Sequence, residues 1–201
     1  MHISEGVLSA AVLVSGGAAA AAAVAAGLKK TDYEGIVNVA ILSSAFFVAS
    51  LIHVNIGPSS VHLVLNGIVG LLLGWAAFPA ILVALLLQAV FFQYGGITVL
   101  GVNTLIMAVP AIVVYYLFSP FLKKGPGAVF AASAAAGAVS IFLSAVLLGA
   151  ALYLTEKEFL EMTLVIISAH VPVMIIEAIV TGFCVTFLKK VYPEILPEKS
   201  R

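Results

Sequence analysis

Seven apolar stretches separated by short polar breaks fill most of this chain of 201 residues. A helix needs about 20 apolar residues to cross a bilayer, and most of the stretches approach that length. They cover roughly residues 8–28, 36–53, 61–78, 79–94, 103–122, 128–154 and 163–188. Charged residues make up only 9% of the chain, whereas soluble domains carry about 25%. The sequence therefore predicts an all-α polytopic integral membrane protein with about seven transmembrane helices, forming a single transmembrane domain over residues 1–201.

Three lysine pairs predict the orientation. Lys29-Lys30, Lys123-Lys124 and Lys189-Lys190 follow the first, fifth and seventh stretches. Since lysine and arginine concentrate on the cytoplasmic side, the odd-numbered spans should run inward, which places eight of the nine basic residues inside and only Lys157 outside. We expect an external N-terminus and a short cytoplasmic tail (189–201) in the plasma membrane. A formal net charge of zero indicates no nucleic-acid partner.

The N-terminal segment 1–7 (MHISEGV) has the donors for a metal site. A signal peptide begins with positive charge, and this segment has no lysine or arginine, so we expect the mature protein to begin at Met1. The terminal amine, the backbone nitrogen of His2 and its imidazole Nδ1 can chelate one ion in a plane. A fourth nitrogen would complete a square, which is typical of Ni(II) or Cu(II).

His62 is the natural fourth ligand. It follows the turn-forming sequence NIGPSS (55–60) at the predicted outer end of the third span. Asn66 lies one helical turn further and is expected on the same face, where it could orient a ligand. The alternative is an interfacial histidine that bonds to a loop. We interpret His53, at the end of the second stretch, as solvated or interfacial.

The seventh stretch contains His170 and Glu177. Ionisable groups inside a membrane are usually functional, and the spacing of these two puts them on one helix face. Pro172 between them predicts a kink. Glu177 either offsets the charge of a bound cation or links two helices, and the link is favoured.

The segment YGGITVLGVN (94–103) is too rich in glycine for a spanning helix. It is predicted to form either a lid over an outward-facing pocket or a re-entrant connector. As a lid, it would allow Gln93 and Asn103 to supply supporting hydrogen bonds.

Small residues predict close helix packing. The first stretch contains SGGAAAAAAVAAG (15–27) and the third contains Gly70-x-x-x-Gly74. Such residues let helices approach closely in lipid. Docking of another subunit on the Ala-rich face is a second hypothesis.

Four segments resemble one family: MHISEG (1–6), GPSSVHLVLNGIVG (57–70), QYGGITVLGVNTLIMAV (93–109) and HVPVMIIEAIVTG (170–182). They are similar to CbiM/NikM proteins, the substrate-binding membrane components of energy-coupling factor (ECF) transporters for cobalt and nickel. The resemblance implies that the Met1 amine, the backbone and imidazole nitrogens of His2, and the His62 imidazole bind Ni²⁺ or Co²⁺ as a transported substrate and not as a cofactor.

The resemblance also implies partners, namely a transmembrane coupling subunit and two cytosolic ATPase subunits that drive uptake. The chain itself has no G-x-x-x-x-G-K-[ST] phosphate-binding motif. Many cobalt-type members carry histidine at the position of Tyr94, so this position is not assigned as a ligand. The choice between nickel and cobalt stays open, and the planar nitrogen set favours nickel.

Other functions remain as alternatives. One is a membrane enzyme that uses His170 and Glu177 as an acid–base pair, although the chain offers no recognisable nucleophile motif and we expect no enzyme. Another is an ECF-type component for an organic vitamin, whose pocket should be lined by aromatics, but the single Trp75 is expected at the cytoplasmic end. A secondary transporter should carry more intramembrane charge than Glu177.

Overall fold

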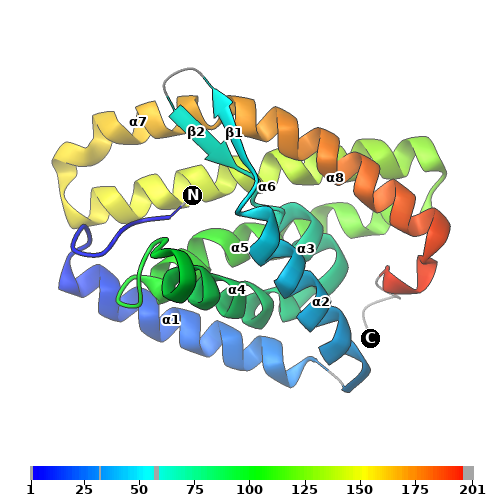
Figure 1. The fold of residues 1–201 in the computed structure, drawn as a ribbon, viewed down its shortest axis with the longest axis horizontal. Coiled ribbons are helices and arrows are strands. Elements are labelled where there is room, and N and C mark those ends of the chain that lie inside the picture. Colours follow the sequence, from blue (N-terminus) through cyan, green and yellow to red (C-terminus); the bar gives the residue numbers. More distant parts are fainter. Residues whose placement is uncertain (1, 32, 57–58, 197–201) are drawn as a thin grey trace.

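The computed structural model describes residues 2–31, 33–56 and 59–196, and within these ranges it contains eight α-helices and one two-stranded hairpin (Figure 1). The helices are α1 (Ala10–Lys29), α2 (Tyr33–Ala49), α3 (Asn66–Leu73), α4 (Ala77–Phe92), α5 (Leu100–Phe118), α6 (Pro126–Thr155), α7 (Leu160–Ala169) and α8 (Val171–Val191). Four short 3-10 segments accompany them: η1 (Gly74–Ala76), η2 (Ser119–Lys123), η3 (Lys157–Phe159) and η4 (Pro193–Ile195). Strands β1 (His53–Ile56) and β2 (Ser59–His62) pair antiparallel, with His53 opposite His62.

The helices have the length and composition of membrane spans. Five helical stretches are long and apolar enough to cross a bilayer: Ala10–Lys29, Asn66–Phe92, Leu100–Lys123, Pro126–Thr155 and Val171–Val191. A shorter apolar helix covers Gly35–Ala49. The predicted all-α polytopic membrane class is confirmed, and four of the predicted stretches (8–28, 36–53, 103–122 and 128–154) coincide with α1, α2, α5 and α6 within a few residues. The number of crossings and the sides of the two ends stay predictions.

The third and fourth stretches differ from the prediction. The expected break at Phe78-Pro79 lies instead at Gly74, whose φ of 52° and ψ of −125° end α3 and start the turn into α4. Glycine adopts positive φ without the steric cost that a side chain brings. Pro79 belongs to the first turn of α4, where a missing N–H costs no helical hydrogen bond.

The prediction that the third helix opens near His62 was wrong. The chain from His62 to Leu65 is non-helical, and α3 begins at Asn66 after Leu65, whose φ is 60°. The carboxylate of Glu177 in α8 accepts the N–H groups of Val64 and Leu65, at 3.0 Å for Leu65. Because a side chain on another helix binds these two donors, helical hydrogen bonding starts only beyond them.

The seventh stretch forms two helices, α7 and α8, that meet at His170. Pro172 lies in the first turn of α8. Proline lacks an N–H and its ring clashes with the carbonyl four residues earlier, so the predicted kink near Pro172 is confirmed and lies just before it. In Figure 1, α1 and the α7–α8 pair lie on opposite sides of the molecule, with α3, α4 and α5 between them.

Glycine in α3 permits close contact with a neighbouring helix. Residues Asn66–Leu72 are all buried, and α3 packs against α5 and α6. A Cβ added to Gly70 would lie 2.2 Å from the carbonyl oxygen of Ala111 in α5, whereas one added to Gly17 in α1 would meet nothing within 4 Å. Gly70 therefore serves packing within the chain. Docking of a subunit on the Ala-rich face of α1 stays a prediction.

We expect Gly70→Ala to lower the free energy of unfolding by about 1–3 kcal/mol, the usual cost of forcing a methyl group into a packed contact. The measurement is the thermal unfolding of purified protein in detergent. Gly17→Ala is the matched control in an equally helical position and should leave the melting temperature unchanged or higher. Equal melting temperatures for the two variants would contradict the proposed α3–α5 contact.

Candidate metal centre

The N-terminal segment folds back into the protein instead of extending away from it. Ile3 and Leu8 are buried, with 4% and 7% of their surfaces exposed. The segment ends at Ser9, whose hydroxyl accepts the N–H of Val12 and caps α1. The burial of these two apolar side chains holds the residues between them, and His2 next to Ile3, against the helices.

Asn103, in the first turn of α5, binds both backbone polar groups of Ile3 in the N-terminal segment. Its Oδ1 accepts the N–H of Ile3 at 3.0 Å, and its Nδ2 donates to the Ile3 carbonyl at 3.0 Å. This paired contact resembles the bonding between strands and satisfies the buried peptide groups on either side of Ile3. Because His2 adjoins Ile3, this contact also fixes where His2 lies in the fold.

The glycine-rich loop between α4 and α5 packs on the same segment. The backbone N–H of Thr98 donates to the Glu5 carboxylate at 3.2 Å. Gly96 has a φ of 147°, and a Cβ there would lie 2.0 Å from Cγ of Glu5. The loop therefore contacts the N-terminal segment at Glu5, and Asn103 supplies hydrogen bonds to the backbone of Ile3. Gln93, the other suggested residue, is exposed.

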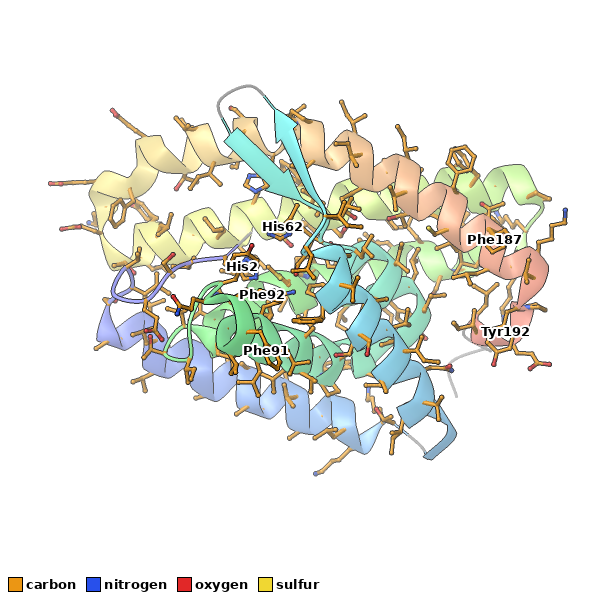
Figure 2. The ribbon with its side chains drawn as sticks, in the orientation of Figure 1. His2, His62, Phe91, Phe92, Phe187 and Tyr192 are labelled. Atoms are coloured by element: carbon orange, nitrogen blue, oxygen red, sulfur yellow. The ribbon has the colours of Figure 1, made fainter. Side chains whose placement is uncertain are left out.

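The fold brings His2 and His62 together from segments far apart in the sequence. Their ring centroids are 5.3 Å apart, with an angle of 33° between the ring planes. Tyr94 lies beside them, with its ring centroid 6.0 Å from that of His2. Figure 2 shows the two histidines next to each other below the β-hairpin.

Hydrogen bonds indicate which nitrogen of each ring carries the proton. Nε2 of His2 lies 2.7 Å from Oε1 of Gln88, an acceptor, so Nε2 carries the proton and Nδ1 keeps its lone pair. Nδ1 of His62 lies 3.0 Å from its neighbour's carbonyl, that of Leu63, so Nδ1 carries the proton and Nε2 keeps its lone pair. Metal-binding histidines are commonly fixed in this way through the nitrogen that does not bind the metal.

His2 is held in its neutral form. Burial of the ring lowers the pKa of His2 to about 3, with a smaller contribution from the neighbouring His62. A neutral imidazole has the lone pair that a metal ligand needs. His2 is therefore ready to bind a cation throughout the physiological pH range.

Gln88 was missed by the sequence analysis. It is fully buried in α4, and it is the only polar side chain between Ala77 and Phe92. A lone amide in an apolar helix is costly unless it has a partner, and this signal could have identified it. Its Nε2 has no hydrogen-bond partner among the described residues.

The other residues that the sequence suggested for the site do not join the pair of His2 and His62 in the described structure. Asn66 does not share a helix face with His62 as predicted, because His62 lies in β2 before α3 begins. Its buried amide donates to Oγ of Ser144 at 2.9 Å, and its role in orienting a ligand stays a prediction. His53 pairs with His62 across the hairpin backbone. Met1 lies outside the described residues. Within the described ranges, no group of three His, Cys, Asp or Glu side chains gathers in a geometry for a metal.

Among the residues that the structure describes, His170 and Glu177 bind different partners. Glu177 is fully buried and its carboxylate is bound to the backbone at Val64 and Leu65, which is the helix link favoured by the sequence. Nδ1 of His170 donates to the Ile166 carbonyl at 2.7 Å. Its ring lines a cavity of about 350 Å³ that His2 also lines.

Comparisons with known proteins identify the family of this chain. Residues 2–195 match the CbiM family, described as the cobalt uptake substrate-specific transmembrane region. The chain is 41% identical to a putative metal transport protein of Haemophilus influenzae, with 98% of this chain and 97% of the relative covered. It is 25% identical to the cobalt transport protein CbiM of Sorangium cellulosum, covering 98% and 94%. It is also 38% identical to the fused nickel transport protein NikMN of Rhodobacter capsulatus, over 54% of this chain and 33% of that protein.

Solved structures of transition metal transporters share this fold. A crystal structure described as a transition metal transporter superposes with a TM-score of 0.80 at 30% identity, covering 95% of this chain and 93% of that one. A truncated transition metal transporter also gives a TM-score of 0.80, at 29% identity over 94% and 99% of the two chains. The chain thus belongs to the CbiM family of substrate-specific transmembrane proteins, and it is a multi-pass membrane transport protein and not an enzyme.

Proposed function

We propose that this chain captures Ni²⁺ or Co²⁺ at the outer face of the cell membrane for ATP-driven uptake by partner subunits. The ligands in this proposal are the Met1 amine, the backbone nitrogen and Nδ1 of His2, and Nε2 of His62. The observation that carries the proposal is the meeting of His2 and His62 with ring centroids 5.3 Å apart. The hydrogen bonds to Gln88 and Leu63 favour the tautomers that this ligand set requires, with the lone pair on Nδ1 of His2 and on Nε2 of His62.

The spacing of the rings fits one ion. With metal–nitrogen bonds of about 2 Å, two imidazoles on adjacent corners of a planar ion have centroids roughly 4.5 Å apart. The rings need to approach each other by only about 1 Å, within the reach of side-chain adjustment around a bound ligand. A planar set of four nitrogens is typical of Ni(II), so nickel is the favoured substrate and cobalt the second.

The partners in this proposal are a transmembrane coupling subunit and cytosolic ATPase subunits. The named relatives are metal transport proteins, among them CbiM and NikMN proteins, and this chain has no phosphate-binding loop of its own. In proteoliposomes, we expect this chain alone to bind nickel without accumulating it. Addition of the coupling and ATPase subunits should give accumulation that stops when ATP is withheld.

The amine ligand is tested by adding four residues, Gly-Gly-Gly-Ser, before Met1. The extension converts the Met1 amine into an amide, which is a far weaker donor, and we expect the tightly bound metal to be lost. A single added glycine would not serve, because its own amine could complete a new planar nitrogen set with the imidazole of His2. The measurement is the metal content of purified protein by mass spectrometry, after equilibration with one equivalent of Ni(II) or Co(II). The same four residues added after Arg201 are the control and should retain one ion per chain. Equal metal content in both forms would exclude Met1 as a ligand.

The hydrogen bond from His2 to Gln88 is tested by Gln88→Leu. Loss of a partner that orients a metal-binding histidine typically costs 10–100-fold in affinity, and we expect the dissociation constant for Ni(II) to rise by about that factor. Gln93→Leu is the matched control, since Gln93 is an exposed glutamine just beyond the end of α4. Competition with a chromogenic chelator measures both variants, and similar constants for the two would show that Gln88 does not orient His2.

A further inference from the structure

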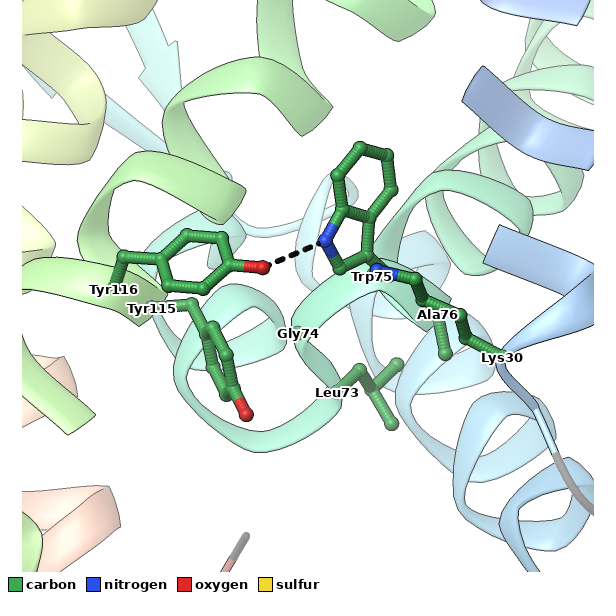
Figure 3. Close-up of a pocket in the computed structure, with 7 residues that line it drawn as sticks. All are labelled: Lys30, Leu73, Gly74, Trp75, Ala76, Tyr115 and Tyr116. Atoms are coloured by element: carbon green, nitrogen blue, oxygen red, sulfur yellow. Dashed lines mark hydrogen bonds between the residues drawn. The ribbon is translucent and has the colours of Figure 1, made fainter. Parts of the chain in front are cut away.

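A second cavity lies far from the candidate metal centre. Its volume is about 430 Å³, and it is bordered by Lys30 at the end of α1, by the Gly74–Ala76 turn and by Tyr115 and Tyr116 near the end of α5. Figure 3 shows Trp75 and the two tyrosines around Gly74. Trp75 precedes α4 and Gln88 lies near its other end, so the rise of the helix separates the two sites by roughly 20 Å.

The wall of this cavity is ordered by specific contacts. Nε1 of Trp75 donates to the hydroxyl of Tyr116 at 2.9 Å, and the rings of Tyr115 and Tyr116 meet edge to face at 5.3 Å. A Cβ on Gly74 would lie 3.1 Å from the Tyr115 ring, and its φ of 52° disfavours other residues. The cavity therefore depends on glycine at the turn.

The chemistry of the lining favours an anion. Nζ of Lys30 lies 4.4 Å from the centre of the Trp75 ring, a contact that positions the ammonium and leaves its charge in place. The Tyr116 hydroxyl accepts a bond from Trp75, so its own proton is available to a ligand. None of the seven residues that line the cavity is acidic. An ammonium and a phenol group match the oxygens of a phosphate.

The surroundings indicate a lipid as the source of the phosphate. The Lys29-Lys30, Lys123-Lys124 and Lys189-Lys190 pairs follow α1, α5 and α8 or end them, and Nζ of Lys189 reaches the carbonyl of Lys124 at 2.6 Å. Basic pockets between membrane helices bind anionic lipid headgroups on the cytoplasmic side. Beside the cavity, Leu117 is 55% exposed and offers an apolar surface for acyl chains.

We propose that the cavity between Lys30, Trp75, Tyr115 and Tyr116 binds the phosphate of an anionic phospholipid headgroup. This site goes beyond the metal function and does not depend on it. The phosphodiester binds the ammonium of Lys30 and the hydroxyl of Tyr116, the Tyr115 ring forms part of the wall, and the acyl chains continue along the outside of α5.

The chain supplies its own probe, because Trp75 is its only tryptophan. Full-length protein in a neutral detergent is titrated with short-chain phosphatidylglycerol, short-chain phosphatidylcholine or inorganic phosphate, while Trp75 fluorescence is followed. We expect a saturable change with phosphatidylglycerol that phosphatidylcholine does not reproduce at the same concentration. Equal responses to the two lipids would overturn the proposal. Saturation by inorganic phosphate at the same concentration as the lipid would also overturn it, because the site would then recognise the free anion.

The variants are Lys30→Gln and its neighbour Lys29→Gln, which removes the same charge outside the cavity. The lysine contribution at a lipid surface predicts an affinity for phosphatidylglycerol about fivefold lower for Lys30→Gln. Lys29→Gln should stay close to the parent protein, and both variants should keep the parent melting temperature. An equal loss in the two variants would mean that only the general surface charge matters, and the cavity would then not be the site.

Discussion

The contact between Glu177 and the backbone at Val64 and Leu65 helps to determine where the candidate metal centre lies. In a bilayer, backbone N–H groups without a partner cost several kcal/mol each. The carboxylate of Glu177 accepts the N–H groups of Val64 and of the N-cap residue Leu65, just before α3. The chain before this point is therefore free of the helix, and His62 can turn towards His2 because it precedes Val64 by two residues.

The same requirement explains how an extended N-terminal segment is accommodated. Asn103 binds both polar groups of Ile3, so that buried backbone has partners without belonging to a sheet. The loop from α4 to α5 then packs against Glu5, which is possible because Gly96 has no side chain. Glu177 and Asn103 thus form hydrogen bonds with the irregular backbone segments that position both histidines.

Features that depend on local composition, such as several helix ends and one kink, could be predicted from the sequence. The ends of α1, α2, α5 and α6 follow from the lengths of apolar stretches, since a bilayer of fixed thickness sets the length of each helix. The kink near Pro172 follows from the covalent structure of proline. The start of α3 could not be predicted in this way, because the group that delays it, Glu177, is 113 residues away from Val64.

The choice between Gln88 and Gln93 shows the same limit at the site. Gln93 attracted attention because it adjoins the glycine-rich loop, yet it is exposed. Gln88 lies one and a half helical turns earlier on the buried face of α4 and meets His2. Sequence spacing alone cannot tell which face of a uniformly apolar helix is buried, since a helix that is apolar all round has no distinct inner stripe. The energetic cost of a buried amide is the better guide.

The register of the N-terminal segment has a consequence for the metal centre. Asn103 binds Ile3 through both its N–H and its carbonyl, so a shift by one residue would break two hydrogen bonds and expose Ile3. The hydrogen bonds on the C-terminal side of His2 therefore help to orient it towards Gln88 and His62. In the proposed ligand set, the Met1 amine and the backbone nitrogen of His2 are added to imidazoles that the fold has already brought together.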